Sequence, residues 1–303
     1  MFDFMLRKNG REIFKIQDFP IQERSATASL LMQNCAQILD WAAWAPGLDD
    51  KDAWIRAASK PSFGLEASPY WQEDAAEPAA KAAAIPAMLR RRLTPLGRGL
   101  AEVLCPLVLK APDAPWVYAS RWGDAALATE LLTAAAKGEP LSPAKFAASV
   151  HNGPASLISI ALGHTGAITA LANGPFSAEA AFESAVSELL HQERVILTVA
   201  EAKPPAAFGT PGATHVWGLL LGRQNETSNE EAWAAEKAKG PFSALTTRAL
   251  EPGEEPDARL EGLSGIPADL EVLSWLLSSK SQVLEHFDRH AAWVWGKSRA
   301  LLD

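Results

Sequence analysis

The segment from Ser149 to Leu190 places a histidine close to a turn between a predicted strand and a predicted helix. His164 lies in the run Gly-His-Thr-Gly-Ala, and the turn, residues 172–177, reads Ala-Asn-Gly-Pro-Phe-Ser. A nucleophile at the amino end of a helix, with a base nearby, is suited to acyl transfer through a covalent intermediate. The turn contains no cysteine, so the segment has the layout for such chemistry without a thiol to perform it.

The chain has two cysteines, Cys35 and Cys105. Two thiols are too few for a disulfide framework, and neither has the neighbouring ligands that a four-ligand zinc site needs. Cys105 lies among leucines in a predicted helix, and Cys35 lies at the start of a predicted strand. We expect both to be buried and inert. This cysteine usage is typical of a reducing cytoplasm.

Histidines are the next candidates for acid–base chemistry. His151 and Asn152 are predicted to lie in a helix that faces the same region as His164, and these three residues are the candidates for a vestigial pocket. The other histidines are scattered: His191, His215, His286 and His290. The last two have i, i+4 spacing but lack the glutamate and the third ligand of a metal-binding helix. The sequence therefore predicts neither a metal site nor a cofactor.

Composition excludes several classes of partner. The 303 residues are 48% hydrophobic and carry a formal net charge of −8. Such a chain is not expected to bind nucleic acid or an anionic membrane surface, because phosphate binding needs an excess of Lys and Arg. No apolar run approaches the ~20 residues of a membrane-spanning helix, and the start of the chain does not resemble a signal peptide. The one dense basic cluster is Arg90-Arg91-Arg92.

Segments with the apolar pattern of a strand alternate along the chain with segments that have the apolar period of a helix. This alternation predicts an α/β fold. Short apolar strands are expected at 36–45, 115–120, 167–171, 194–202 and 214–222. Helices are expected at 85–109, where Pro95 and Pro106 interrupt the stripe, at 123–138, and at 177–192 with Ser177 as N-cap. The acidic region 224–266, rich in Pro and Gly, predicts a loop. An amphipathic stretch from Pro267 to about Lys297 predicts a helical segment that packs on the core.

The order of strands and helices between residues 149 and 200 resembles the first half of a β-ketoacyl synthase. More closely, the chain resembles the β-ketoacyl synthase-like N-terminal domain family, often labelled chain length factor, of aryl-polyene and related gene clusters. The resemblance extends over roughly residues 32 to 303. Other pieces that carry it are "DWAAWAPGL", "LRRRLTPLGRGLAEVLCPL", "VYASRWGDAALATELL", "LSWLL" and "AAWVWGK".

The resemblance implies a thiolase-like half fold, in which a ketosynthase-like sheet is flanked by helices and followed by a C-terminal helical extension. We divide the chain into an N-terminal extension (1–31), the ketosynthase-like domain (32–223), the acidic loop region (224–266) and the C-terminal segment (267–303). The residues after Gly222 are expected to be too few for the second half of a ketosynthase, which supplies its histidines.

The resemblance also implies a function. Active ketosynthases carry the acylated cysteine in an Ala-Cys-Ser-Ser run, where this sequence has Ala172-Asn173-Gly174. We therefore expect a cytoplasmic, non-catalytic accessory subunit of fatty-acid or polyketide synthesis that pairs with a catalytic ketosynthase. Arg90, Arg91 and Arg92 are the candidate patch for an acyl carrier protein. The alternative is an active acyltransferase or condensing enzyme with another nucleophile, such as Ser120 or Ser177.

Overall fold

A single mixed sheet forms the centre of the molecule. The computed structural model describes residues 5–8, 11–15, 35–72, 75–208, 211–223, 241–250, 253–256, 267–279, 281–289, 291–298 and 301. Within these residues the sheet has eight strands, in the spatial order β5 (Ile168–Leu171), β4 (Trp116–Ala119), β6 (Arg194–Glu201), β7 (His215–Arg223), β3 (Cys35–Trp44), β8 (Phe242–Ala249), β10 (Ala291–Lys297) and β9 (Val283–Phe287). β5, β4 and β6 are parallel, and every later pair is antiparallel.

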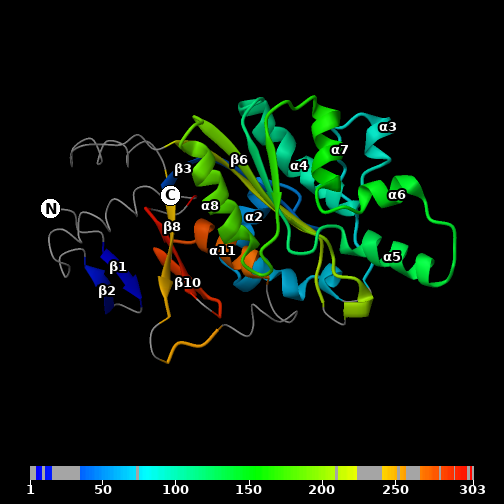
Figure 1. Ribbon diagram of the computed structural model, residues 1–303. Helices are drawn as coiled ribbons and strands as arrows, with labels where there is room; N and C mark the ends of the chain where they lie inside the picture. The colour runs from blue at the N-terminus through cyan, green and yellow to red at the C-terminus, as the bar shows by residue number, and fades with distance from the viewer. Residues whose placement is uncertain are drawn as a thin grey trace.

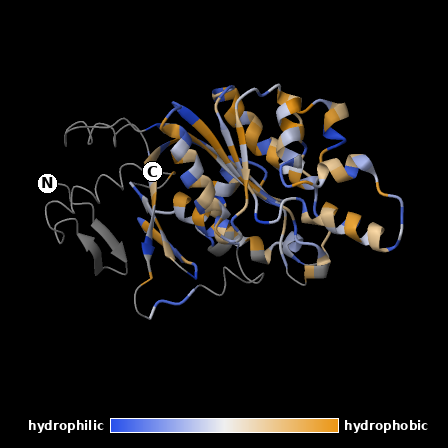
Figure 2. Cartoon of the chain, viewed as in Figure 1, coloured by the Kyte–Doolittle hydropathy of each residue, from blue (hydrophilic) through white to orange (hydrophobic). Residues whose placement is uncertain are grey.

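The central strands are buried on both faces, and their side chains divide between two cores with the period of two that a strand imposes. In β6, Val195, Leu197 and Val199 join one core, whereas Ile196 and Ala200 join the other. Figure 2 shows the resulting hydrophobic strands at the centre of the molecule. This arrangement confirms the expected sheet flanked by helices, and the strands predicted at 115–120, 167–171 and 194–202 all lie in it.

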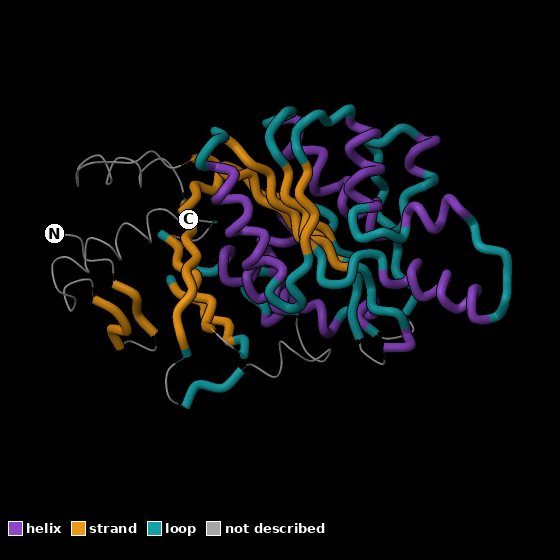
Figure 3. Tube along the Cα trace, in the orientation of Figure 1, coloured by secondary structure: helices purple, strands orange, loops and turns teal. Residues whose placement is uncertain are grey.

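Helices form the outer layers (Figures 1 and 3). One core contains side chains of α2 (Lys51–Ala57), α8 (Ser177–Leu189) and α11 (Ala268–Leu277), and the other contains side chains of α4 (Pro95–Lys110) and α7 (Gly153–Leu162). The remaining helices are α3 (Ala87–Arg90), α5 (Ala125–Ala136), α6 (Pro143–Ala148) and the 3₁₀ helices η2 (Pro61–Ala67), η3 (Pro69–Trp71) and η4 (Ala206–Phe208).

Prolines affect the expected 85–109 helix in two different ways. The apolar segment 85–109 forms two helices, α3 and α4, instead of one. Pro95 is the first residue of α4, a position where a missing backbone N–H is tolerated. Pro106 lies inside α4 without ending it.

The C-terminal region differs from its prediction. Only Ala268–Leu277 is helical, and residues 283–287 and 291–297 are the strands β9 and β10 rather than the end of a helix. Trp293 and Trp295 are two residues apart, so in a strand they point to the same side, where both pack on the core of α8 and α11. The pairing of β10 with β8 is a tertiary contact, and it outweighs the helical preference that the apolar pattern of residues 283–297 indicated.

The acidic region 224–266 also contains a strand that the loop prediction missed. Residues 242–249 form β8, which pairs with the start of β3 and along all of β10. Residues 224–240 and 257–266 lie outside the described residues.

The N-terminal extension contains a small hairpin of β1 (Met5–Lys8) and β2 (Arg11–Lys15). Met32, the expected start of the ketosynthase-like domain, lies outside the described residues. The division of the chain into an extension, a ketosynthase-like domain and a C-terminal segment stays a prediction.

Candidate functional site

The carboxyl ends of the parallel strands meet at one edge of the sheet. β4 ends at Ala119, β5 at Leu171 and β6 at Glu201, while the antiparallel β7 begins at this edge with His215. The backbone N–H of Ser120 donates to the carbonyl of Leu171 at 3.2 Å. Because the turn at residues 172–176 follows β5 here, the region expected to carry a nucleophile lies at the same edge as the polar residues at the ends of β4, β6 and β7.

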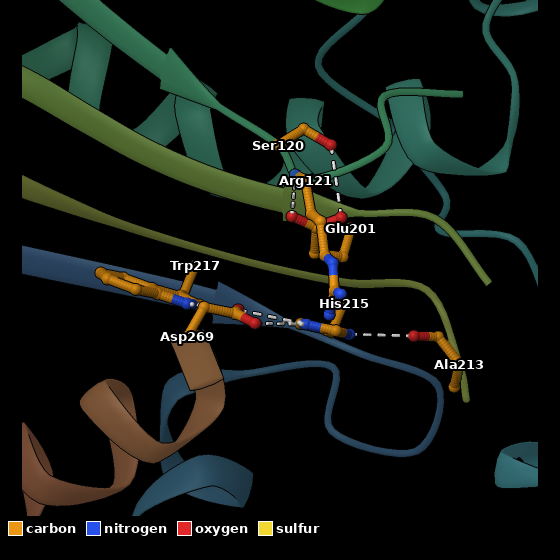
Figure 4. A network of polar contacts seen from close by, with 7 residues as sticks. All are labelled: Ser120, Arg121, Glu201, Ala213, His215, Trp217 and Asp269. Carbon is orange, nitrogen blue, oxygen red and sulfur yellow. Dashed lines mark hydrogen bonds and ion pairs between the residues drawn. The ribbon is translucent and has the colours of Figure 1, made fainter. Parts of the chain in front are cut away.

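Glu201 is the central acid of this edge (Figure 4). Its Oε1 accepts a hydrogen bond from the backbone N–H of Arg121 at 2.5 Å, and its Oε2 lies 3.4 Å from Ser120 Oγ. Glu201 is buried, as is Ser120, whose Oγ also accepts from the N–H of Gly123 at 2.8 Å. Burial, and then the charge of Asp269, raise the pKa of Glu201 to about 8, because both disfavour the carboxylate.

His215 is opposite Glu201 in the β6–β7 register and binds a second acid. Its Nε2 lies 3.1 Å from Oδ2 of Asp269, its Nδ1 lies 2.9 Å from the carbonyl of Ala213, and the indole of Trp217 donates to the same Asp269 oxygen at 3.0 Å. Burial by itself lowers the pKa of His215, but Asp269 and the other acceptors outweigh it and raise the pKa to about 9. The ring is therefore an imidazolium at neutral pH.

Arg121 supplies a second cation. Figure 4 shows its side chain extending between Glu201 and His215. Burial lowers the pKa of Arg121, and the carboxylates of Glu201 and Asp269 oppose that shift. Two acids and two bases thus lie together at the sheet edge, and they tie β4, β6, β7 and α11 to one another.

We expect the free energy of unfolding to fall as pH rises from about 5 to 9. Glu201 has an ordinary pKa of 4.5 and a native pKa of about 8, and His215 has an ordinary pKa of 6.5 and a native pKa of about 9. Between these values the native state holds protons that the unfolded state has released, so raising the pH favours unfolding.

Replacing Glu201 by glutamine should remove part of this slope, because the amide stays neutral. Urea denaturation at several pH values should show the E201Q variant gaining about 4 kcal/mol on the wild type between pH 5 and pH 9. The exposed Glu193→Gln variant is the control and should follow the wild type. Parallel curves for wild type and E201Q would contradict the assignment.

Sequence reasoning missed this network and counted His215 only among the scattered histidines. A signal was present in the sequence. Glu201 ends one continuous apolar strand and His215 begins another, and charged or titratable side chains are uncommon in such buried segments. The sequence does not show that the two strands are neighbours or that Asp269 reaches them from α11.

The predicted pocket residues are not brought together. His151 Nε2 lies 2.9 Å from the carbonyl of Ser120, and its ring packs on Tyr118 at the carboxyl end of β4. His164 Nδ1 lies 2.9 Å from the carbonyl of Pro112, and its ring packs on Trp116 at the other end of that strand.

The expected helix around His151 begins later than predicted. Asn152 is the N-cap residue of α7, without a side-chain cap bond, so His151 and Asn152 lie in the turn before that helix.

The turn after β5 is held by Ser177. The backbone N–H of Asn173 donates to Ser177 Oγ at 3.0 Å, and that hydroxyl donates to the carbonyl of Gly174 at 2.8 Å. Ser177 is the first residue of α8 and not its N-cap, a position that Phe176 takes. Gly174 has φ 55°, a conformation that favours glycine over a residue with a side chain.

Residues 64–296 match the model of a known family, the β-ketoacyl synthase N-terminal domain. This is more than half of the chain. The chain belongs to this family. The match confirms the resemblance on which the sequence interpretation rests. No curated protein sequence matches the chain.

Solved structures with a ketosynthase-like fold agree with this membership. A structure described as the ketosynthase ApeO in complex with its chain length factor ApeC, from Xenorhabdus doucetiae, is 22% identical with a TM-score of 0.66, covering 86% of this chain and 98% of that one. The ishigamide ketosynthase/chain length factor is 16% identical with a TM-score of 0.52, covering 88% and 99%. AntDE:AntF, described as an acyl-carrier protein in complex with its ketosynthase, is 10% identical with a TM-score of 0.55, covering 87% and 99%. At these identities the likeness shows the thiolase-like ketosynthase fold.

Both thiols of this family member are buried. Burial raises the pKa of Cys35 to about 12, and burial together with Glu102 raises the pKa of Cys105 to about 11. A thiol with so high a pKa carries almost no thiolate at neutral pH, which makes it a poor nucleophile.

The basic cluster lies at the end of α3. Arg91 and Arg92 are exposed, and Arg90 is half-buried, with its guanidinium 3.5 Å from the carbonyl of Ala82. Within the described residues, no helix is long and apolar enough to span a membrane. Likewise, no set of three or more His, Cys, Asp or Glu side chains in the described ranges is arranged to hold a metal ion.

Proposed function

We propose that this protein is a non-catalytic, chain-length-factor-like subunit that pairs with a catalytic ketosynthase in fatty-acid or polyketide synthesis of the aryl-polyene type. Its role is to shape the pocket into which the growing acyl chain extends. The observation that carries the proposal is that the turn after β5 contains no cysteine; we assign Asn173 and Gly174 in this turn to the position where active ketosynthases carry the acylated cysteine. Neither an asparagine amide nor a glycine can hold an acyl thioester.

The hydroxyls considered as alternative nucleophiles are poorly placed for attack. Ser177 Oγ donates to the carbonyl of Gly174, and both Ser177 and Ser120 are buried. Ser120 Oγ lies 3.4 Å from Glu201, whose raised pKa leaves it mostly protonated at neutral pH. A protonated carboxyl group is not a general base, so it does not activate the hydroxyl.

The free edge of β5 is the proposed pairing surface. In the described part of the chain β5 is the last strand on its side of the sheet, and its four residues, Ile-Thr-Ala-Leu, carry no charge. Thr169 and Ala170 are exposed. Soluble proteins usually protect such an edge with charges, prolines or a covering element. An edge strand without that protection is suited to pairing with a strand of another subunit.

The segment that leads into β5 adds apolar surface. This segment contains helices α5, α6 and α7, which are coloured mainly as hydrophobic in Figure 2. The helices and the loops between them expose five large apolar side chains: Leu132, Leu141, Phe146, Val150 and Ile160. Exposed apolar groups that gather in one segment are typical of protein–protein interfaces. They support an association surface that extends beyond the strand itself.

Arg90, Arg91 and Arg92 remain the proposed contact for an acyl carrier protein. Arg91 and Arg92, which are exposed at the end of α3, are accessible to an acidic partner. The carrier protein would then contact residues that are distant in the sequence from the β5 edge.

Incubation with an acyl-carrier-protein thioester tests the absence of a nucleophile. We expect intact-mass spectrometry to find no covalent acyl adduct, because the turn holds no thiol and both cysteines are buried. The double variant Cys35→Ser, Cys105→Ser should give the same result, and an active ketosynthase is the positive control. A stable adduct on any residue of the wild type would favour the acyltransferase alternative.

A further inference from the structure

The C-terminal hairpin of β9 and β10 packs directly against the turn and the first turns of α8. Phe176 stacks on Trp293 with ring centroids 6.4 Å apart, and Phe182 packs on Trp295 at 4.9 Å. Trp293 is itself oriented by a hydrogen bond from its indole to Asp288, 3.1 Å long. The hairpin therefore contacts the segment that follows β5 through aromatic side chains.

A buried ion cluster lies beside these aromatic contacts. His286 of β9 is 1% exposed, and its Nδ1 lies 2.6 Å from Oε1 of Glu179 in the first turn of α8. Its Nε2 lies 3.3 Å from Oε2 of Glu271 in α11. The indole N–H of Trp295 donates to the same Glu179 oxygen at 3.1 Å. One imidazole thus joins three elements.

The geometry determines the protonation of this ring. Both ring nitrogens face carboxylate oxygens, so each must carry a proton to interact favourably, and only the imidazolium does so. The charged groups that face it are Glu179 from α8 and Glu271 from α11, and β10 contributes the indole of Trp295. Burial by itself lowers the pKa of His286, whereas the two glutamates outweigh burial and raise it to about 9.

We propose that His286 is a positioning residue: held between Glu179 and Glu271, its imidazolium fixes the C-terminal hairpin against the start of α8 and so holds the 172–176 turn in the shape that it presents beside the β5 edge. Glu179 is separated from that turn by only Ser177 and Ala178, so movement of the first turn of α8 is transmitted to it. The link between this turn and pairing rests on the proposed function, but the positioning itself does not.

Hydrogen–deuterium exchange of the isolated protein tests the positioning. In His286→Gln the amides of residues 172–182 should exchange about tenfold faster or more, since one charged hydrogen bond corresponds to roughly that factor. The amides of α4 should be unchanged. Wild-type protein should show the same local increase, after correction for intrinsic exchange, as pH rises through about 9, because the ring then loses a proton. His191→Gln, at an exposed position, is the matched control.

Two further readouts separate positioning from general loss of stability. If His286→Gln does not fold, Glu271→Gln removes the outer carboxylate alone and should give a smaller increase in the same peptides. NMR of ¹⁵N-histidine-labelled protein should find both nitrogens of His286 protonated at neutral pH. A neutral ring, or a folded H286Q variant with unchanged exchange at 172–182, would overturn the proposal. Faster exchange with unchanged pairing would support the positioning role and contradict the link between this turn and pairing instead.

Discussion

Replacing Ala170 or Ala172 by glutamate is expected to weaken strongly the proposed pairing with a catalytic ketosynthase. Both alanines are exposed, one in the edge strand β5 and one directly after it. A carboxylate there would become buried without a partner when two strand edges meet, and a buried unpaired charge costs several kcal/mol. We expect the dissociation constant to rise at least about hundredfold.

Co-expression followed by size-exclusion chromatography, with affinity measured on the separate proteins, would check this result. Thermal unfolding of each variant should match the wild type, because an exposed alanine loses no native contact. Ala84→Glu places the same charge on an exposed position far from β5 in sequence, and this variant should pair normally. A wild-type chain that ignores the cognate ketosynthase at micromolar concentration would rule out the obligate-subunit hypothesis.

Asp269→Asn is expected to give the largest loss of stability among single substitutions at the sheet edge. The carboxylate accepts from Trp217 at 3.0 Å and lies 3.1 Å from His215 Nε2, and all three side chains are buried. The amide leaves the imidazolium of His215 without its counter-charge. Removing one member of a buried ion pair costs about 3 to 5 kcal/mol.

Urea denaturation at neutral pH measures this loss. The control is Asp113→Asn, because Asp113 also accepts a side-chain hydrogen bond, from Thr165, but is exposed. Its effect should stay within about 0.5 kcal/mol. In the double variant with His215→Gln the two losses should not add, since both remove the same interaction. Additive losses would show that Asp269 acts through other contacts.

The strands and helices with strong, uninterrupted patterns could be predicted from the sequence. β4, β6 and β7 are continuous apolar runs, and a strand buried on both faces needs such a run whatever its neighbours are. α8 could also be predicted without knowing its neighbours. The spacing of its apolar residues indicates both that it is a helix and which of its faces is buried. Family membership was also accessible, since it depends on the order and spacing of motifs along the chain.

The C-terminal region and the polar site could not be predicted in this way. The pattern of 283–297 is compatible with more than one element, and its pairing with β8 makes it a hairpin. The network at the sheet edge joins residues that are distant in the chain: Ser120 and Glu201 are 81 positions apart, and His215 and Asp269 are 54 apart. No local pattern records which of these groups will meet.

The sequence by itself determined that the turn after β5 lacks a thiol, because the identity of a residue does not depend on folding. Only the tertiary structure decided what the remaining polar groups do. His286 and Glu179, 107 positions apart, become an ion pair because β10 places the hairpin against α8. Neighbouring carboxylates, acting against burial, then make His215 and His286 cations, while burial makes Glu201 a neutral acid at the same pH. Charge in a protein interior depends on solvent exclusion and on neighbouring groups, and both exist only after the chain has folded.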